Sequence, residues 1–378
     1  MKILNKYTYL FLGLVLIIIV SIFLIIPNFQ TEEFDQDVIE NIIEGVTTTT
    51  IVDSNLDSEI IENDENPNIQ EEDLNISKEE SSEIQNILTF NNVGQDIDGF
   101  DTYLLIGSDE RSEEISLTRG KVSGKRADVI ILGMVHKETN VTTLLSFPRD
   151  LLILNKCTDK LERINASFSK NNCGGSAENI AAAIYSISGI KINHFASFDF
   201  EGFEKIIDSV GGIEICVDVT QREGFSFELQ KGCQRTSGLT TLNWVVSRAT
   251  EELVGEKILD SEGNDNSEWK LISGVSDLTR ITRQQYVVIQ LINELKSFES
   301  VADLNKFIKA LEDTFIIDEN LTINKAVDLL WTFRDFDIEN VNKLTTPTDY
   351  MTLKDGRQVL ILNENIYDFL YRNSVINN

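Results

Sequence analysis

The sequence predicts an α/β fold, with strands and helices layered in one domain from about residue 89 to the end of the 378-residue chain. Short apolar runs that are typical of buried strands alternate with longer segments in which apolar residues recur every three or four positions. Several of the helical segments end at glycine, which commonly closes helices. No segment repeats at a fixed period, so a repeat architecture is not expected.

The first strands include a hairpin. Residues 102–107 (TYLLIG) form a short buried strand, and residues 128–136 and 141–150 flank the turn sequence KETN, which predicts a tight hairpin. The elements that follow are helices at 177–189, 201–212, 281–298, 301–313, 323–336 and 364–373 and strands at 194–200 and 213–219.

A charge-free apolar stretch follows the first six residues. Residues 7–26 hold no charged side chain over 20 positions, the length that a helix needs to cross a bilayer. Lys2 and Lys6 favour a cytoplasmic stub at residues 1–6, with the bulk of the chain extracytoplasmic. A cleavable signal peptide is the alternative, but the run is long and no A-x-A-like site follows it. The sequence therefore predicts a single-pass protein of the cell membrane.

Acidic residues dominate the next stretch. Residues 31–87 contain 18 aspartates and glutamates against one lysine, so they carry −17 of the net charge of −29. Such a segment cannot bury enough apolar surface to offset its ordering entropy. We predict a disordered linker at residues 27–88, followed by the folded domain at residues 89–378. The charge and the location both argue against binding to nucleic acid.

The four cysteines fall into two local pairs, Cys157 with Cys173 and Cys216 with Cys233. Outside the cytoplasm two disulfides are the natural interpretation. Tetrahedral zinc is the alternative, but the chain has no C-x-x-C spacing and two histidines in all. We therefore predict two disulfides.

The predicted hairpin places two charged residues opposite each other. If its turn centres on Glu138 and Thr139, cross-strand partners have residue numbers that add to 277, and Asp128 faces Arg149. A loop with an odd number of residues would shift this register by one. The simplest interpretation of Asp128 and Arg149 is a cross-strand ion pair.

The arginines are unevenly distributed. Of 13 in the chain, none precedes Arg111, and ten lie between Arg111 and Arg283. In the stretch DLTRITRQQ, Asp277 is a candidate N-cap, and Arg280, Arg283 and Gln284 share one face of the first helical turns. Arginines at a helix N-terminus suit a polyanion, because guanidinium groups and free N–H groups both bind phosphate oxygens.

Carboxylates lie among these arginines. The sequence GSDER puts Asp109 and Arg111 on a loop after the first strand, at an edge where open α/β sheets commonly bind ligands. Asp109 and Asp128 suit a hard divalent cation that bridges phosphates. No P-loop, G-x-S-x-G or G-x-G-x-x-G motif is present. The residues alone thus indicate a candidate site for a diphosphate with magnesium or a similar ion.

Seven motifs occur in a fixed order over roughly residues 102–285. They are YLLIGSDER, KRADVIILGMV, TTLLSFPRD, RINASF, FASFDFEGFEKIIDSVGGIEICV, SRAT and DLTRITRQQ. This ordered set resembles the LytR-CpsA-Psr (LCP) proteins. The resemblance implies a three-layer α-β-α sandwich with a mixed central sheet and a pocket for a polyprenyl tail. It also implies transfer of a glycopolymer, as a phosphoglycosyl unit, from a polyprenyl-pyrophosphate carrier to peptidoglycan or a related wall polymer.

The resemblance assigns roles to individual residues. The arginines implied at the pyrophosphate are Arg111, Arg126, Arg149, Arg248 and Arg280. The implied ligands of Mg²⁺ (or Mn²⁺) are Asp109 and Asp128, with Ala127 in place of the serine of the family's R-S-D motif. The implied substrate-binding residues are Arg163, Asn165, Arg283, Gln284 and Asp277. The paired cysteines resemble those of the actinobacterial branch.

The sequence departs from the family pattern at two places. Val246 stands where the family commonly has the first arginine of R-x-R, so that Arg248 alone is kept. An acidic insertion at residues 251–270 is longer than the usual loop. The missing arginine points to weaker binding, a different substrate or a paralogue of reduced activity. Two alternatives to transfer therefore stay open: hydrolysis of the polyprenyl diphosphate, and a non-catalytic lipid-glycan binding or regulatory role.

Overall fold

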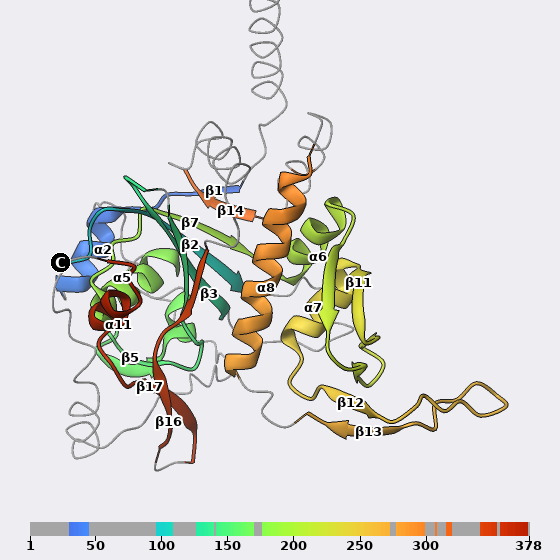
Figure 1. Ribbon diagram of the computed structural model, residues 1–378. Helices are drawn as coiled ribbons and strands as arrows, with labels where there is room; N and C mark the ends of the chain where they lie inside the picture. Colours follow the sequence, from blue (N-terminus) through green and yellow to red (C-terminus); the bar gives the residue numbers. More distant parts are fainter. Residues whose placement is uncertain are drawn as a thin grey trace, which may run out of the picture. The chain divides into compact units, whose positions relative to one another are not determined.

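Figure 1 shows the computed structural model, which describes residues 30–44, 96–108, 126–139, 141–169, 176–272, 277–298, 307, 315–319, 341–353 and 356–376. The chain divides into two compact units. We call Phe34–Phe195 with Asn342–Asn378 the sheet unit, and Met1–Glu33 with Ala196–Val341 the α8 unit. The sequence predicts one domain from residue 89. The structure divides that stretch because the chain leaves the sheet unit after residue 195 and returns to it at residue 342.

A mixed sheet forms the centre of the sheet unit. Its neighbouring strands are β2 (Phe100–Ser108), β3 (Ala127–His136), β4 (Thr142–Ser146) and β15 (Asn342–Thr345). The first three pair antiparallel, and β15 joins β4 in parallel. Every residue of β4 is buried, as expected for a strand that is covered on both faces. The α/β class with a mixed sheet is therefore confirmed.

The β3–β4 hairpin has the predicted register. Ile131 pairs with Ser146, and each later pair of the ladder keeps a sum of 277. Since the side-chain period of a strand is two residues, a slip of one position would have turned the buried side chains of one strand outward. The register thus directs the ends of both strands, with Asp128 and Arg149, to the same end of the hairpin.

The helix α5 (Ser176–Ser188) matches the helix predicted at residues 177–189. Nearly all of its side chains are buried, because the alanines and isoleucines of its sequence leave no polar face. It ends at Gly189, whose φ of 71° lies in the left-handed region that glycine adopts without strain. The helix α2 (Gln36–Glu44) packs against α5 (Figure 1).

The prediction of a disordered linker over residues 27–88 is wrong for residues 30–44. This segment contains the strand β1 (Gln30–Glu32) and α2. Phe34, Ile39 and Ile42 are buried, because the three- and four-residue spacing of apolar side chains gives α2 one face that packs. The acidic residues of α2 occupy its opposite face. Residues 27–29 and 45–88 of the predicted linker lie outside the described residues.

Smaller elements complete the sheet unit. They are β5 (Leu152–Asn155), β6 (Lys160–Arg163), a 3-10 helix (Ile164–Phe168), β16 (Thr348–Thr352), β17 (Gln358–Leu362) and α11 (Ile366–Arg372). The hairpin β16–β17 packs on β5 through Leu152, Leu353 and Val359. The helix α11 confirms the helix predicted at residues 364–373, and its N-cap Asn365 accepts a hydrogen bond from the Tyr367 amide.

The α8 unit is named for the long helix α8 (Asp277–Lys296). Its other elements include most of β7 (His194–Phe198), which begins in the sheet unit, and α6 (Phe200–Ser209), β8 (Ile213–Val217), β11 (Gly232–Thr236), α7 (Gly238–Val246) and β14 (Phe315–Asp318). A hydrophobic cluster that includes Ile207, Ile215, Trp244 and Val287 joins α6, β8, α7 and α8. The strands β7 and β8 and the helices α6 and α8 confirm the predicted elements, whereas α7 was not predicted.

Two cysteines lie opposite each other in this unit. The strands β8 and β11 pair antiparallel with Cys216 facing Cys233. The two Sγ atoms lie 2.03 Å apart, which is a disulfide distance. In the other predicted pair, Cys173 lies outside the described residues.

The acidic insertion at residues 251–270 forms a β-hairpin rather than an irregular loop. Its strands β12 (Glu251–Val254) and β13 (Glu268–Leu271) pair antiparallel and extend a small sheet. The order of this sheet is β10 (Phe227–Leu229), β9 (Gln221–Glu223), β12, β13. Figure 1 shows the hairpin continuing well beyond the two labelled strands.

Several predictions fall on parts of the chain that the structure does not describe. They are the apolar segment at residues 7–26 and most of the helices predicted at residues 301–313 and 323–336. Among the described residues, no helix has both the length and the apolar character that crossing a membrane requires.

Candidate active site

Asp128 and Arg149 form an ion pair at the end of the β3–β4 hairpin that lies away from its turn. Arg149 Nη1 lies 2.6 Å from Asp128 Oδ1 and donates a hydrogen bond to it. Their side chains are 18% and 15% exposed, so both charges are largely withdrawn from water. The ion pair predicted from the register is therefore confirmed. Its partial exposure leaves the pair accessible to a ligand.

A β-bulge places Asp128 at this position. Gly107 on β2 pairs with Val129, but the next residue of β2, Ser108, pairs with Ala127. Asp128 is thus the extra residue on β3. A bulge interrupts the ladder and redirects the side chains beside it, and bulges often lie next to active sites. No local sequence pattern signals this bulge, because it arises from the pairing with β2.

Asp150 links two of the predicted arginines. Its Oδ2 lies 3.7 Å from Arg149 Nε, and its Oδ1 lies 3.4 Å from Arg163 Nε. Arg163 also donates from Nη2 to the Gln358 carbonyl at 2.8 Å. The backbone N–H of Asn165 donates to the backbone carbonyl of Arg149 at 3.2 Å, and Asn165 is buried. Sequence reasoning missed Asp150 as a functional residue, although the third position of its P-R-D motif was a signal.

The remaining predicted residues of this group follow or precede the same strands. Arg126 is exposed and comes directly before β3. Because Ser108 pairs with Ala127, the chain leaves β2 beside the point at which it enters β3. Asp109 and Arg111 follow β2 directly in the sequence, but they lie outside the described residues. The sheet unit thus gathers Arg126, Asp128, Arg149 and the Asp150–Arg163 pair around the ends of three neighbouring segments.

In the α8 unit, Arg283 is buried and bonded to the protein. Its Nη1 donates to the Trp244 carbonyl at 2.8 Å, and its Nη2 donates to Thr250 Oγ1 at 3.1 Å. The guanidinium carbon lies 5.1 Å from the centre of the Trp244 ring. Burial lowers the pKa of Arg283 to about 10, although the nearby Glu223 raises it, so the group stays charged at neutral pH. These contacts tie α8 to the end of α7.

The other predicted residues of the α8 unit differ in exposure. Arg280 is buried and Gln284 is half-buried, both in the first turns of α8, and Arg248 is exposed just beyond α7. Val246 is the last residue of α7. The sequence placed Asp277 as the N-cap, whereas the helix already includes Asp277 as its first residue. Its side chain is not among the described ones.

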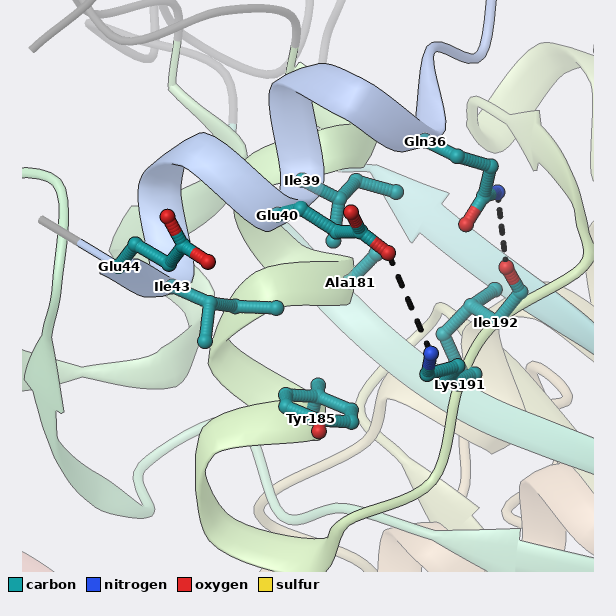
Figure 2. Close-up of a pocket in the computed structure, with 9 residues that line it drawn as sticks. All are labelled: Gln36, Ile39, Glu40, Ile43, Glu44, Ala181, Tyr185, Lys191 and Ile192. Carbon is teal, nitrogen blue, oxygen red and sulfur yellow. Dashed lines mark hydrogen bonds and ion pairs between the residues drawn. The ribbon is translucent and has the colours of Figure 1, made fainter. Parts of the chain in front are cut away.

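A separate cavity of about 250 Å³ lies between α2 and α5 (Figure 2). Ile39, Ile43 and Ala181 give it an apolar wall, and the ion pair of Glu40 with Lys191 lies across it. The hydroxyl of Tyr185 donates to Asp96 at 2.6 Å, and this hydrogen bond is the main reason why its pKa rises to about 12. None of the predicted phosphate-binding residues lines this cavity.

The cluster around Asp128 and Arg149 has the chemistry of a phosphate site. Guanidinium groups present paired N–H donors to phosphate oxygens and stay protonated. A carboxylate beside them supplies the oxygen ligand that Mg²⁺ prefers. In the described part of the chain, the Asp128 carboxylate lies on the bulge and contacts Arg149. A second carboxylate, that of Asp150, contacts both Arg149 and Arg163.

Comparisons with known proteins identify relatives of this chain. The probable cell wall biosynthesis protein LcpB of Corynebacterium glutamicum is 31% identical over 155 residues, 39% of this chain and 36% of that protein. This chain therefore spans about a third of the length of that relative. The polyisoprenyl-teichoic acid–peptidoglycan teichoic acid transferase TagU of Bacillus anthracis is 24% identical over 268 residues, 70% of this chain and 75% of that protein.

A solved structure shares the fold. The LytR-Csp2A-Psr enzyme from Actinomyces oris superposes with a TM-score of 0.55 at 22% identity, over 74% of this chain and 93% of that chain. The model of the LytR_cpsA_psr family matches residues 57–255 and 270–373. These two stretches include every predicted site residue and cover well over half of the sequence. The chain belongs to the LytR-CpsA-Psr family.

Proposed function

We propose that this protein transfers a glycopolymer, as a phosphoglycosyl unit, from a polyprenyl-pyrophosphate carrier to peptidoglycan or a related wall acceptor. The observation that carries the proposal is the ion pair of Asp128 with Arg149 at the β-bulge near the start of β3, with Asp150 and Arg163 beside it. Family membership supports it, because the matching TagU is named as a transferase from a polyisoprenyl carrier to peptidoglycan.

The proposed reaction is a phosphoryl transfer. A hydroxyl of the acceptor attacks the phosphorus that carries the glycan, and a new P–O bond forms. The bond from this phosphorus to the bridging oxygen breaks, polyprenyl phosphate leaves, and the hydroxyl proton passes to solvent or to a base. Negative charge grows on the leaving phosphate, and positioned guanidinium groups stabilise this charge.

Five arginines are proposed to bind the pyrophosphate. They are Arg111, Arg126, Arg149, Arg248 and Arg280. Arg163, Asn165, Gln284, Arg283 and Asp277 are proposed to bind substrate around them. The contacts of Arg283 with Trp244 and Thr250 support an indirect role, in which it holds α8 in place while its neighbours contact phosphate.

Mg²⁺ or Mn²⁺ is proposed to bind at Asp109 and Asp128. Asp128 fits such an ion because hard cations bind carboxylate oxygens. Its Oδ1 already contacts a positive charge, the guanidinium of Arg149. Such an ion, when bound, neutralises charge on the transferring phosphate. In its absence Arg149 supplies the positive charge that compensates Asp128. Asp128 would hold such an ion, and Arg149 would then be free to donate to a phosphate oxygen.

The remaining features of the proposal follow the family resemblance. They are a three-layer α-β-α sandwich, an anchor in the cell membrane through residues 7–26 with the bulk of the chain outside, and disulfides at Cys157–Cys173 and Cys216–Cys233. The disulfide distance between Cys216 and Cys233 supports the second of these bonds.

The decisive experiment is a reconstituted transfer assay. Purified full-length protein in detergent is given a polyprenyl-pyrophosphate-linked oligosaccharide and a soluble peptidoglycan oligomer, with MgCl₂ or EDTA. Transfer predicts that polyprenyl phosphate and the glycan-peptidoglycan adduct appear together, and only with acceptor and metal. Asp128→Asn should largely abolish this turnover and leave the circular dichroism spectrum unchanged. Arg235→Ala, which removes an exposed arginine paired with Glu294, serves as the control variant.

The two alternatives give different outcomes in the same assay. A pyrophosphatase releases polyprenyl phosphate equally well without acceptor, because water takes the place of the hydroxyl. A regulatory protein binds the lipid without turnover, and Val246 in place of an arginine favours this outcome. Restoring the arginine with Val246→Arg should then raise turnover if the missing guanidinium is what limits the reaction.

A further inference from the structure

The hairpin at residues 251–271, called the arm below, extends beyond the fold that the family shares. The family model matches residues 57–255 and then resumes at residue 270, so the distal part of the arm lies outside the match. The described structure nevertheless gives this part a defined shape with regular pairing at its base. An added segment with its own strand pairing is a candidate for a separate role.

A clasp centred on Arg222 holds the base of the arm. Arg222 Nε lies 3.1 Å from Glu251 Oε2, and its Nη1 lies 2.7 Å from Asp265 Oδ2. Its guanidinium carbon stacks 3.9 Å above the Trp269 ring, and the Trp269 indole N–H donates to the same Asp265 carboxylate at 3.0 Å. Glu251, Asp265 and Trp269 all belong to the arm, so one arginine of β9 fixes three of its side chains.

Hydrogen bonds within residues 260–264 define the turn at the tip of the arm. The Asp260 carboxylate accepts hydrogen bonds from the amides of Glu262 and Asn264 at 2.9 and 2.8 Å. Gly263 has a φ of 86°, a backbone conformation that residues other than glycine rarely adopt. The Asp260 amide donates to the Asn264 carbonyl at 3.0 Å, and Leu259 forms a bridge with Asp265. The arm is therefore preorganised, which lowers the entropy cost of binding.

Two large apolar side chains lie exposed next to this turn. Ile258 and Leu259 are each 56% exposed. Within the same arm, Val254 and Leu271 are also exposed. A patch of exposed apolar side chains is typical of an interaction surface.

The charge of the arm is strongly negative. It holds seven acidic residues against two lysines, a net charge of −5. Arg222 compensates Glu251 and Asp265, and Lys257 pairs with Glu228 outside the arm. Three glutamates, Glu256, Glu262 and Glu268, are exposed and form no ion pair with any residue that the structure describes. The arm that carries the exposed Ile258 and Leu259 thus also carries three uncompensated carboxylates.

We propose that the arm is a docking surface for a second protein that presents lysines or arginines around a shallow apolar pocket. Ile258 and Leu259 fill the pocket, and Glu256, Glu262 and Glu268 face the basic rim. Anionic lipid and anionic wall polymers do not fit, because the carboxylates repel them. A second copy of this chain does not fit either, since each copy carries a net charge of −29.

Site-specific photo-crosslinking tests the proposal. The full-length protein is expressed in its own bacterium with p-benzoylphenylalanine in place of Leu259, and cross-linked peptides are identified by mass spectrometry. We expect one adduct, with a different protein, at a peptide that contains lysine or arginine. The double variant Glu256→Lys with Glu262→Lys, or 0.5 M salt, should lower its yield at least fivefold. The purified partner should bind wild type at least tenfold more tightly than Ile258→Ser with Leu259→Ser.

The matched control places the same probe at Leu239, an exposed residue of α7 outside the arm, where this adduct should not form. Several outcomes would overturn the proposal: no adduct at position 259, an adduct with lipid, glycan or a second copy of this chain, or a yield that charge reversal and salt leave unchanged. None of the substituted residues belongs to the proposed transferase site, so transfer activity in the purified assay should stay at the wild-type level. Loss of the adduct and loss of transfer are therefore separate results.

Discussion

Asp128 Oδ1 and Arg149 Nη1 lie 2.6 Å apart although the two residues are 21 positions apart in the chain. The pair joins a proposed metal ligand to a proposed phosphate ligand. Each partner is thereby occupied by the other when neither ligand is bound. Binding of a metal at Asp128 and of a diphosphate at Arg149 should consequently favour each other, because each ligand frees the residue that the other needs.

Replacement of Arg149 should reveal this exchange. Arg149→Ala should lower the affinity for a polyprenyl diphosphate at least tenfold, about 1.4 kcal/mol. Without metal the variant should also melt earlier than wild type, because Asp128 and Asp150 lose the guanidinium between them. Mg²⁺ should raise the melting temperature of the variant more than that of wild type. Differential scanning fluorimetry with MgCl₂ and with EDTA measures both melting temperatures. If Mg²⁺ raised the melting temperature of the variant and of wild type equally, a metal site at Asp128 would be disproved.

Arg283 and Arg280 should behave differently although they are three positions apart. Arg283→Ala leaves the Trp244 carbonyl and Thr250 Oγ1 without this donor in a buried setting, so we expect a loss of about 2 kcal/mol in the free energy of unfolding. Arg280→Ala should instead lower lipid affinity at least tenfold. Urea denaturation and lipid binding, measured on both variants, separate the two roles. A variant of Arg283 that keeps full stability and loses lipid affinity would contradict the structural role.

The cysteines give a chemical test of the exported state. Peptide mapping without reduction should find Cys216 joined to Cys233 and Cys157 joined to Cys173. Replacing Cys216 and Cys233 together by serine should cost about 3 kcal/mol of stability in the loop-entropy model, given their separation of 17 residues. Four free thiols in protein purified from the extracytoplasmic side would disprove both bonds.

The clasp on the arm should open at low pH. Hydrogen bonds from the side chain and amide of Ser267, with smaller effects from Trp269 and Arg222, lower the pKa of Asp265 from 3.8 to about 2. Because the folded pKa is depressed, the stabilisation is complete above about pH 4 and is lost as the pH falls through 2. The indole N–H resonance of Trp269 should therefore stay constant from pH 7 to 4 and move below it. Asp265→Asn should show the shifted resonance at every pH.

The sequence was sufficient for local relationships. The register of the β3–β4 hairpin followed from the short turn between two apolar runs, and with it the contact of Asp128 and Arg149. The helices α5 and α6 followed from periodicity and from glycines at their ends. In each case the determining interactions lie within a few residues in the chain.

Relationships that depend on distant segments could not be predicted. The bulge at Asp128 exists because the register between β2 and β3 shifts by one residue between Gly107 and Ser108, and no local pattern encodes this shift. Arg283 finds its partners at Trp244 and Thr250, more than 30 positions earlier. The helix α2 was not predicted because the acidic composition was averaged over residues 31–87. That average does not show that nine of these residues have a helix pattern with one apolar face.

The parallel pairing of β4 with β15 has a consequence for how the protein is made. Thr143 pairs with Asn342, 199 positions later. Closing so long a loop delays this contact, and the outer edge of β4 keeps unpaired N–H and C=O groups until it forms. A nascent chain that has not yet emerged beyond residue 345 therefore carries an open strand edge, which favours aggregation. Completion of the sheet unit must be a late step in folding, and it requires the last tenth of the chain.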